Sequence, residues 1–310
     1  MKKETELAVI ENLTKKIRGA KKISKLAGDA SSREYFRVFT GEDTLVAMVY
    51  MENNPEEIGR IENLTKIYME AGIRVPEIVD QIGDNILLQE DVGDISIQNY
   101  LSNASEKNYL KIRDDIGSIL KKIKNIKASN TDFELDLRKM KFEIDFFIDN
   151  FVLSFSPDWG SHQALREEIL ENLDKISGKR IFAHRDFHSR NIFVKDENYY
   201  LIDFQDSLLA PEFYDSVSFV FDPYLQPGST QFFLPIFEKK SEKEMEQIYL
   251  TAYQRGIKAL GTFGYQYFAG NRKFYRYIQP TINNLRKNIC FSEGSRLDLL
   301  FKSVEKRNHI

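Results

Sequence analysis

Residues 184–191 contain the side chains with the clearest capacity for chemistry, and they read His-Arg-Asp-Phe-His-Ser-Arg-Asn. Asp186 follows a His-Arg pair, and four residues separate it from Asn191. In phosphoryl transfer, an Asp at this position accepts the proton of the acceptor hydroxyl, and an Asn at this spacing binds a metal ion. The motif therefore predicts a catalytic loop in which Asp186 is the base and Asn191 is a metal ligand.

Asp203 is the second predicted metal ligand, twelve residues beyond Asn191. Apolar residues at 192–194 and 199–202 flank a polar turn, which predicts a β-hairpin with Asn191 and Asp203 at its open ends. Strand pairing would then bring both residues close to Asp186. Oxygen-bearing side chains of this kind suit Mg²⁺, which takes few carboxylates together with substrate phosphates. Taken alone, a residue such as Asp203 could simply form a turn or cap a helix. The order and spacing of Asp186, Asn191, the hairpin and Asp203 together favour a catalytic interpretation.

The composition sets bounds on the class of protein. At 310 residues with 42% hydrophobic side chains, the chain is long enough for two domains with sizeable cores. The net charge of -3 gives no overall attraction to nucleic acid or to an anionic membrane, and no apolar run is long enough to cross a bilayer. A single cysteine, Cys290, excludes an intrachain disulfide and fits a reducing compartment. The N-terminus lacks the apolar core of a signal peptide, so we expect a cytoplasmic protein.

Short alternating stretches near the N-terminus predict an antiparallel sheet. A helix is expected first, at residues 4–18, because apolar residues recur there at intervals of three and four. Polar turns then separate three strand-like stretches, at residues 21–26, 34–39 and 44–51. Strands joined in this way form an antiparallel meander, the expected start of a small nucleotide-binding lobe.

The turn at residues 28–32, Gly-Asp-Ala-Ser-Ser, is expected to lie over the phosphates of a nucleotide. Small residues let backbone N–H groups approach phosphate oxygens, and the hydroxyls of Ser31 and Ser32 add donors. An ordinary hairpin turn is the alternative interpretation, because only one glycine is present in the turn.

The third expected strand lacks the lysine that pairs with nucleotide phosphates in kinases. Residues 46–49 read Val-Ala-Met-Val, and no lysine occurs in residues 44–55. Arg37 on the neighbouring strand is our candidate substitute, and Arg33 lies on the same face by the two-residue alternation of a strand. The alternatives are that both arginines are solvated strand-edge charges, or that the protein does not catalyse transfer.

An apolar strand that runs into acidic residues predicts the hinge between two lobes. A helix is expected before it at residues 55–71, with Pro in its first turn. Residues 86–93 read Ile-Leu-Leu-Gln-Glu-Asp-Val-Gly. The backbone groups near Glu90 and Val92 are expected to pair with the edge of an adenine.

The lobe boundary is placed after this hinge, with a small nucleotide-binding lobe at residues 1–92 and a large helical lobe at residues 93–310. The large lobe is predicted to hold the catalytic loop and the substrate site. A helix is expected to begin at Ala210, and Asp215 is expected either to cap it or to hold the backbone of the catalytic loop. The fold class is therefore α+β, with an antiparallel-sheet small lobe and a mainly helical large lobe. The other helices of the large lobe are expected at residues 107–127, 134–152, 162–176, 241–263 and 273–287.

Two motifs carry a family resemblance, residues 184–191 and the Ile-Asp-Phe-Gln-Asp sequence at residues 202–206. They resemble the motifs of the aminoglycoside-phosphotransferase-like kinases, a superfamily with the protein-kinase architecture. The resemblance is closer to the bacterial N-acetylmuramate/N-acetylglucosamine anomeric kinases, in which the strand lysine is also absent. Further matching stretches lie at residues 28–38, 71–76, 87–94, 214–218 and 254–261.

The resemblance implies a two-lobed protein-kinase-like fold and ATP- and Mg²⁺-dependent phosphorylation of the anomeric hydroxyl of an N-acetyl sugar. The product is a sugar 1-phosphate formed in cytosolic cell-wall recycling. Carried over by position, Asp186 matches the base, and Asn191 and Asp203 match the metal ligands. We expect a monomer whose ligands are ATP and a small-molecule sugar, with no nucleic-acid or membrane partner. The candidates for sugar binding are Glu143, His188 and Arg255.

Two other functions stay open on the residues alone. The local motifs specify phosphoryl transfer to a hydroxyl, so a kinase of the same fold that acts on an aminoglycoside or an amino alcohol is one alternative. A cationic substrate calls for a cluster of acids in the large lobe, and residues 142–147 supply only Glu143 and Asp145. A non-catalytic nucleotide-binding protein is the other alternative, and consumption of ATP on addition of sugar distinguishes it.

Overall fold

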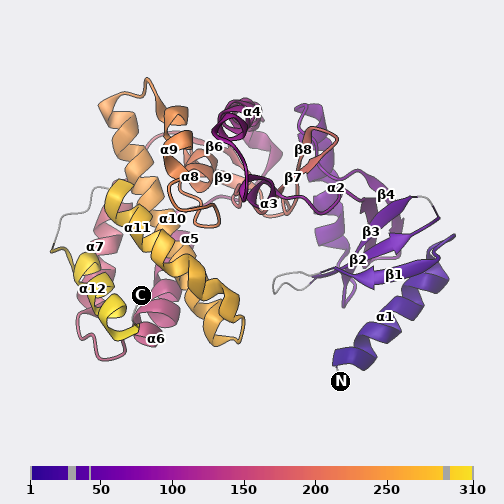
Figure 1. The fold of residues 1–310 in the computed structure, drawn as a ribbon, viewed down its shortest axis with the longest axis horizontal. Helices are drawn as coiled ribbons and strands as arrows, with labels where there is room; N and C mark the ends of the chain where they lie inside the picture. The colour runs from indigo at the N-terminus through magenta and orange to yellow at the C-terminus, as the bar shows by residue number, and fades with distance from the viewer. Residues whose placement is uncertain (1, 27–32, 42, 289–293, 309–310) are drawn as a thin grey trace. The chain divides into compact units, whose positions relative to one another are not determined.

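The chain divides into two compact units in a computed structural model (Figure 1). The structure describes residues 2–26, 33–41, 43–288 and 294–308. The first unit comprises residues 1–95 and 192–205, and the second comprises residues 96–191 and 206–310. Residues 192–205, which the sequence analysis assigns to the large lobe, group with the first unit. The identity of the two units as nucleotide and substrate lobes stays a prediction.

The first unit is built on a five-stranded antiparallel sheet with the strand order β1-β2-β3-β5-β4. Its strands are β1 (Lys22–Lys25), β2 (Arg33–Phe39), β3 (Thr44–Tyr50), β4 (Ile78–Ile82) and β5 (Ile86–Glu90). The first three strands pair in chain order, which confirms the predicted meander. β3 is the central strand, and its residues from Val46 to Tyr50 are all buried. Its apolar sequence follows from this position, because both faces of a central strand are covered.

Alternation along β2 sends its side chains to opposite faces of the sheet. Phe36 and Val38 are buried in one core cluster with Leu13 of the N-terminal helix α1 (Lys2–Lys16) and with Ile17, the residue after the helix. Figure 1 shows α1 running beside β1. Arg33, Tyr35 and Arg37 therefore project from the other face of β2, as the sequence predicts. The second helix of this unit is α2 (Pro55–Glu70).

β7 (Ile192–Lys195) and β8 (Asn198–Leu201) form the predicted hairpin. Its turn residues Asp196 and Glu197 have φ angles of 49° and 60°, the left-handed conformation that a two-residue hairpin turn requires. Backbone hydrogen bonds from both strands to residues of the first unit hold the hairpin in that unit. Asp203 follows the end of β8, so the hairpin determines where this carboxylate lies in the first unit.

The second unit is mainly helical, as the sequence predicts. Its longer helices are α4 (Glu106–Lys124), α5 (Leu137–Phe147), α7 (His162–Leu173), α10 (Glu242–Phe268), α11 (Ile278–Asn288) and α12 (Arg296–Asn308). Its shorter helical segments are α3 (Ile97–Leu101), η1 (Ala128–Asn130), η2 (Ile148–Val152), α6 (Leu153–Phe155), α8 (Tyr214–Val220), α9 (Thr230–Phe233), η3 (Leu234–Phe237) and η4 (Arg272–Tyr277). Among the described residues, no helix combines the length and the apolar character needed to span a bilayer.

A two-stranded antiparallel ladder corrects one prediction. β6 (Arg180–Ala183) pairs with β9 (Leu208–Pro211), so the helix expected from Ala210 begins instead at Tyr214. The short apolar run at residues 208–211 is compatible with either a strand or a helix. Its pairing with β6, which the sequence does not show, makes it a strand. Two expected helices are also divided, because the π segment η2 follows α5 and the 3₁₀ segment η4 precedes α11.

α10 packs closely against α5 and η2 at two glycines. A Cβ at Gly261 would lie 3.0 Å from the Cα of Phe147, and a Cβ at Gly264 would lie 2.1 Å from the carbonyl oxygen of Asn150. Backbone meets backbone at Gly264, so only glycine fits there without a shift of the helix. This contact fixes the position of α10, the helix that carries Arg255.

Candidate active site

The catalytic loop at residues 184–191 follows β6 and is held by Asp215. One carboxylate oxygen, Oδ2, accepts the backbone N–H of His184 at 2.7 Å, and Oδ1 accepts that of Arg185 at 3.0 Å. Asp215 is buried in the first turn of α8, and burial raises its pKa although His184 and the two N–H bonds partly oppose this. Of the two roles predicted for Asp215, the structure confirms that it holds the loop backbone. The anchor fixes Arg185 at a φ of 76°, in the left-handed region.

A second buried carboxylate, Asp222, holds the other end of the loop. Its Oδ2 accepts the backbone N–H of Ser189 at 2.7 Å, and its Oδ1 accepts that of Tyr224 at 2.8 Å. Burial raises the pKa of Asp222, against the opposing effect of its bonds to Ser189. Sequence reasoning missed this residue, because the only signal is a single Asp after the apolar end of α8.

Asp186, the predicted base, lies beside two cations of α10. Lys258 Nζ is 3.0 Å and Arg255 Nη1 is 3.5 Å from Oδ1 of Asp186. Residues three positions apart share a helix face, so α10 presents both cations to the loop. Burial by itself raises the pKa of Asp186, but Lys258, Arg255 and Arg185 together lower it well below its usual value. Asp186 is therefore a carboxylate that stays ionised, and it is a weak base.

Sequence reasoning did not single out Lys258. The available signal was its spacing of three residues from Arg255 within a stretch that carries the family resemblance. Burial lowers the pKa of Lys258, and the attraction of Asp186 opposes this shift. Arg255 is also well enclosed, and its guanidinium lies 5.3 Å from the centre of the Tyr214 ring, at a distance typical of a cation–π contact.

Glu143 on α5 joins the same charged cluster. Its Oε2 accepts a hydrogen bond from the side-chain amide of Gln254, and its Oε1 lies 3.5 Å from Nη2 of Arg185. Arg185 is also 3.9 Å from a carboxylate oxygen of Asp206. The structure therefore brings the predicted substrate residue Glu143 into the same group of charges as Asp186.

His188 is a neutral imidazole within the catalytic loop. Burial lowers its pKa to about 3, although Asp186 partly opposes the shift. The ring meets the ring of Tyr224 edge-on, with centroids 5.0 Å apart. Within the described part of the chain, the buried Nδ1 of His188 has no hydrogen-bond partner. Since buried polar atoms of native proteins are generally paired, this nitrogen is suited to bind a ligand group.

In the first unit, the predicted metal ligand Asp203 lies beside Arg33. Asp203 Oδ1 accepts a hydrogen bond from Gln205 Nε2 at 2.8 Å and is 3.6 Å from Nη2 of Arg33. The side chain of Arg33 is 11% exposed, whereas that of Asp203 is 42% exposed. The arginine is thus held along the sheet, and the carboxylate is accessible to a ligand.

Arg37 is directed instead at the acidic segment after β5. Its Nε binds Asp91 at 2.6 Å, and its Nη1 binds Asp94 at 2.9 Å. The hydrogen bonds to Asp94 and Asp91 raise the pKa of Arg37. Lys195 Nζ adds bonds of 2.9 Å to the carboxylate of Glu90 and to the carbonyl oxygen of Asp91. Two cations therefore hold the segment in which nucleotide-binding backbone groups are predicted.

The predicted metal ligands have the donor chemistry that Mg²⁺ prefers. Asn191 Nδ2 donates to the carbonyl oxygen of Asp186 at 3.1 Å, which leaves the amide oxygen as a donor to a cation. No group of three or more His, Cys, Asp and Glu in the described chain forms a complete metal site, but Mg²⁺ needs only one or two protein oxygens beside substrate phosphates. Asn191 belongs to the second unit and Asp203 to the first, and their joint role stays a prediction. Ser31 and Ser32 lie outside the described residues.

Comparisons with known proteins bear on the family and the fold of the chain. The model of the phosphotransferase enzyme family matches residues 22–248. The N-acetylmuramate/N-acetylglucosamine kinase of Pseudomonas aeruginosa is 24% identical over 292 residues, which cover 83% of this chain and 82% of that protein. A protein of the same name from Neisseria meningitidis is 23% identical over 286 residues, 84% of each chain.

A solved structure supports the fold class. Spectinomycin phosphotransferase, crystallised with ADP and spectinomycin, matches with a TM-score of 0.63 at 13% identity, over 96% of this chain and 98% of that one. At this identity the likeness concerns the fold, and it confirms the predicted α+β class with protein-kinase-like architecture. Both kinds of comparison confirm the predicted resemblance.

Proposed function

Because the chain belongs to the phosphotransferase enzyme family, we propose that it transfers the terminal phosphoryl group of ATP to the anomeric hydroxyl of N-acetylmuramate or N-acetylglucosamine. It is a kinase with an alcohol group as acceptor. The observation that carries the proposal is the ionised carboxylate of Asp186, held beside Lys258 on a loop that Asp215 anchors. The choice of sugar is supported by the names of the two relatives.

The weak basicity of Asp186 favours an acidic acceptor hydroxyl. In the proposed step, O1 of the sugar attacks the γ-phosphorus, the bond from that phosphorus to the β,γ-bridging oxygen breaks, and ADP leaves. The proton of the hydroxyl passes to Asp186, late in the transfer because the pKa of Asp186 is low. An anomeric hydroxyl is more acidic than an ordinary alcohol, so a weak base suffices. Before transfer, Asp186 orients this hydroxyl in line with the phosphate.

The charges around Asp186 favour a neutral or anionic acceptor. Arg185 faces this carboxylate while also lying near Glu143 and Asp206, and Arg255 and Lys258 contact it directly. A polycationic aminoglycoside would be repelled by them, because like charges brought together out of water cost several kcal/mol. The carboxylate of N-acetylmuramate and the uncharged N-acetylglucosamine are both compatible with this cluster.

Three residues are proposed to contribute to the sugar site. The Nδ1 of His188 is suited to pair with a sugar hydroxyl or amide, because it is buried without a partner in the described chain. Arg255 contacts Asp186 directly, which supports a role beside the reacting hydroxyl. Glu143 acts on the acceptor side through Arg185, which its carboxylate holds at 3.5 Å.

On the nucleotide side, we assign the phosphate-binding cation to Arg33. It takes the place of the absent strand lysine, and its contact with Asp203 supports this role. Arg37 contributes by holding the segment of Asp91 and Asp94. The other residues proposed to bind the nucleotide are Ser31, Ser32, Glu90 and Val92.

Asn191 and Asp203 are proposed to bind Mg²⁺. The cation neutralises charge on the phosphate oxygens when it is bound. Asp203 is accessible, and Gln205 and Arg33 fix its carboxylate. The proposal also includes a cytoplasmic location and a monomeric state.

The test compares two sugars that differ at one oxygen. The protein is incubated with ATP, Mg²⁺ and either N-acetylglucosamine or its 1-O-methyl glycoside, and the products are identified by phosphorus NMR. N-acetylglucosamine and N-acetylmuramate are expected to give 1-phosphates, and the methyl glycoside is expected to give none. Phosphorylation of the methyl glycoside at a comparable rate would contradict the anomeric assignment while leaving the kinase assignment intact.

An aminoglycoside or amino alcohol acceptor is the second candidate, which the likeness to spectinomycin phosphotransferase favours. Spectinomycin and choline are therefore included as acceptors in the same assay. Transfer to either at a higher kcat/KM than to both N-acetyl sugars would establish this alternative. A non-catalytic nucleotide-binding protein would consume ATP no faster than Asp186→Asn does with any of these acceptors.

A further inference from the structure

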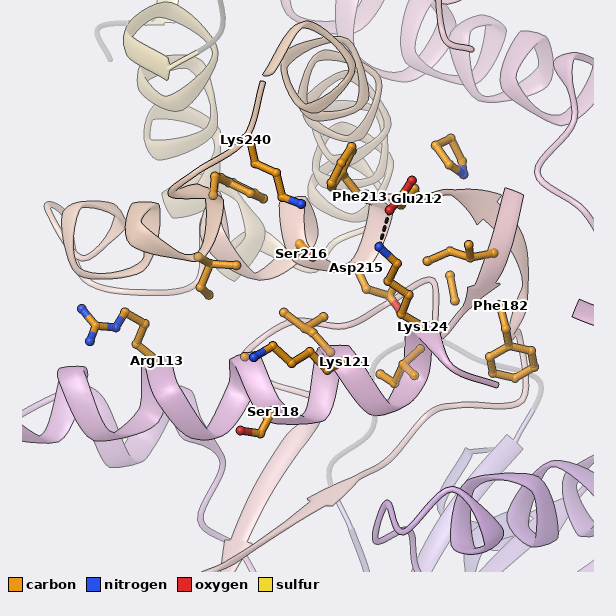
Figure 2. Close-up of a pocket in the computed structure, with 18 of the residues that line it drawn as sticks. Arg113, Ser118, Lys121, Lys124, Phe182, Glu212, Phe213, Asp215, Ser216 and Lys240 are labelled. Carbon is orange, nitrogen blue, oxygen red and sulfur yellow. Dashed lines mark hydrogen bonds and ion pairs between the residues drawn. The ribbon is translucent and has the colours of Figure 1, made fainter. Parts of the chain in front are cut away.

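A pocket of about 600 Å³ lies in the second unit, and Asp186 is not among its lining residues. Helix α4 forms one wall, η3 and the following Lys240 form another, and β6 and β9 contribute its base. Figure 2 shows Lys124 and Lys240 reaching into this space from opposite walls. Small-molecule sites have volumes of about 300–1,000 Å³, so the pocket has room for a ligand of metabolite size.

The base of the pocket is aromatic, and its rim carries the cations Arg113, Lys121, Lys124 and Lys240 together with the acids Asp114 and Glu212. On the rim, Lys124 is paired with Glu212, whereas Lys121 makes no ion pair with any described residue. Lys240 Nζ is paired with Glu244 of the next helical turn at 3.1 Å and lies 5.2 Å from the centre of the Phe213 ring. A flat apolar group on the base and an anionic group at Lys121 and Lys240 match these surroundings. The buried aromatic residues that line the pocket are Phe182, Phe213 and Phe237.

Gly117 leaves the α4 wall of the pocket open. It lies in the interior of α4, where glycine disfavours a helix. A Cβ at this position would meet no heavy atom within 4 Å. A larger side chain at position 117 would therefore extend into the pocket without forcing the backbone to move, and it offers a direct way to fill the space.

The pocket reaches the residues that fix the catalytic loop. Asp215 lines the pocket and also accepts the backbone N–H groups of His184 and Arg185. Ala183 of β6, the residue before the loop, is a further lining residue. A ligand seated on the base thus packs against the strand and the carboxylate that determine the loop conformation.

We propose that this pocket is an effector site for a small organic anion with a flat apolar body, and that its occupancy changes the turnover of the kinase through Asp215. The apolar body lies on the aromatic base, and the anion is bound by Lys121 and Lys240. Coupling of this kind is reciprocal for binding, so ligands of the catalytic loop change the affinity of the effector by the same factor.

The probe for the test is 1-anilinonaphthalene-8-sulfonate, a flat aromatic anion whose fluorescence rises in apolar surroundings. Lys121→Glu is expected to weaken its binding about tenfold, because a favourable charge contact becomes repulsive. Lys122→Glu makes the same charge change at the next residue of α4, which does not line the pocket, and should alter binding by less than about twofold. The uncharged N-phenyl-1-naphthylamine should bind all three proteins alike. Equal losses of anion binding in the two variants would overturn the proposed site.

The second arm fills the pocket and measures turnover. Gly117→Leu is expected to prevent binding of the probe, whereas Gly59→Leu, in α2 of the first unit with equally open surroundings, should not. At saturating ATP and N-acetylglucosamine, the probe is expected to change the kcat of the wild type by at least about twofold and that of Gly117→Leu not at all. Probe binding that survives Gly117→Leu would refute the location, and binding without any change in kcat would refute the effector role. Circular dichroism of each variant verifies its fold, and the binding arms do not depend on the identity of the sugar.

Discussion

Two charged clusters, one in each unit, differ in the balance of charge around their central residue. Asp186 is a single carboxylate contacted by Lys258 and Arg255. In the first unit, the single guanidinium of Arg37 is shared between the carboxylates of Asp91 and Asp94. Asp186 thus has two cations among its direct contacts, whereas Arg37 has two acids among its own.

The difference indicates which cluster is adapted to chemistry. Asp186 has two cationic partners, so removal of one still leaves the other. These cations also offset the negative charge of an approaching phosphoryl group. Removal of Arg37 leaves Asp91, which is 6% exposed, beside a second carboxylate. Breaking a partly buried pair leaves an uncompensated charge and lowers stability. The Asp186 cluster should therefore respond to mutation in kinetics, and the Arg37 cluster in stability.

Asp186→Asn should have the largest effect. The amide cannot accept the proton of the acceptor hydroxyl, so kcat should fall by about 10²–10⁴ while nucleotide affinity stays close to that of the wild type. The measurement is ADP formation with N-acetylglucosamine together with calorimetric binding of nucleotide. Asp174→Asn, at an exposed position after α7, is the matched control. More than about a tenth of the wild-type rate in Asp186→Asn would exclude Asp186 as the base.

Asp215→Asn should rank second and separate activity from stability. An amide has one acceptor oxygen, so one of the two loop N–H groups loses its partner at a cost of roughly 1–3 kcal/mol. This corresponds to about 10- to 100-fold in kcat if the loss falls on the active loop conformation. An unchanged kcat would mean that the N–H groups of His184 and Arg185 do not depend on this carboxylate.

The stability of Asp215→Asn has a distinct pH dependence. Burial raises the folded-state pKa of Asp215 above its usual value of 3.8, so the folded chain holds this proton to higher pH than the unfolded chain does. In the window between the two pKa values, the free energy of unfolding therefore falls as pH rises. Asn has no such ionisation, so in this window the free energy of unfolding of the variant relative to that of the wild type should rise with pH, as measured by urea unfolding of both proteins from acid to neutral pH. A parallel profile would contradict the raised pKa.

Lys258→Met should have an intermediate effect that depends on pH. Without this cation the pKa of Asp186 rises, since Lys258 contributes to its depression. Asp186 is then protonated at higher pH, and the acid limb of the kcat/KM profile should move upward. At neutral pH a loss of about tenfold is expected for the removal of one charge-assisted contact.

Two variants sharpen this result for Lys258. Lys258→Arg keeps the charge and should restore part of the rate and the position of the acid limb. Lys243→Met removes an exposed lysine from the first turns of the same helix and should change neither. An acid limb in Lys258→Met that coincides with that of the wild type would argue against electrostatic control of Asp186 by this residue.

Arg33→Ala and Arg37→Ala should have the smallest and most specific effects. If Arg33 binds phosphate, its loss should raise the KM for ATP by up to about tenfold with little change in stability. Arg37→Ala should lower the free energy of unfolding by roughly 1–3 kcal/mol, because Asp91 and Asp94 lose their partner, and should raise the KM for ATP less. The reverse ranking of the two KM values would assign the phosphate-binding role to Arg37.

The sequence predicted best what is close together along the chain. The hairpin, the sheet meander and the spacing of Asp186 and Asn191 are local patterns, and strand alternation placed Arg33 and Arg37 on one face. The sequence did not predict which residues these side chains contact, because tertiary packing brings the partners from distant elements. Lys258 contacts Asp186 across 72 positions. The orientation of Arg37 toward Asp91 across 54 positions shows the same limit.

The close packing at Gly264 predicts the phenotype of a mutation at this position. Any side chain there requires α10 to move away from the carbonyl oxygen of Asn150, and Lys258 lies six residues earlier on the same helix, about 9 Å along its axis. We therefore expect a movement of the helix end to reach the catalytic loop, although the atoms nearest to Gly264 belong to η2. In a genetic screen, Gly264→Ala would appear as a conditional, temperature-sensitive allele of the kinase, and compensating suppressors would map to η2 rather than to the loop itself.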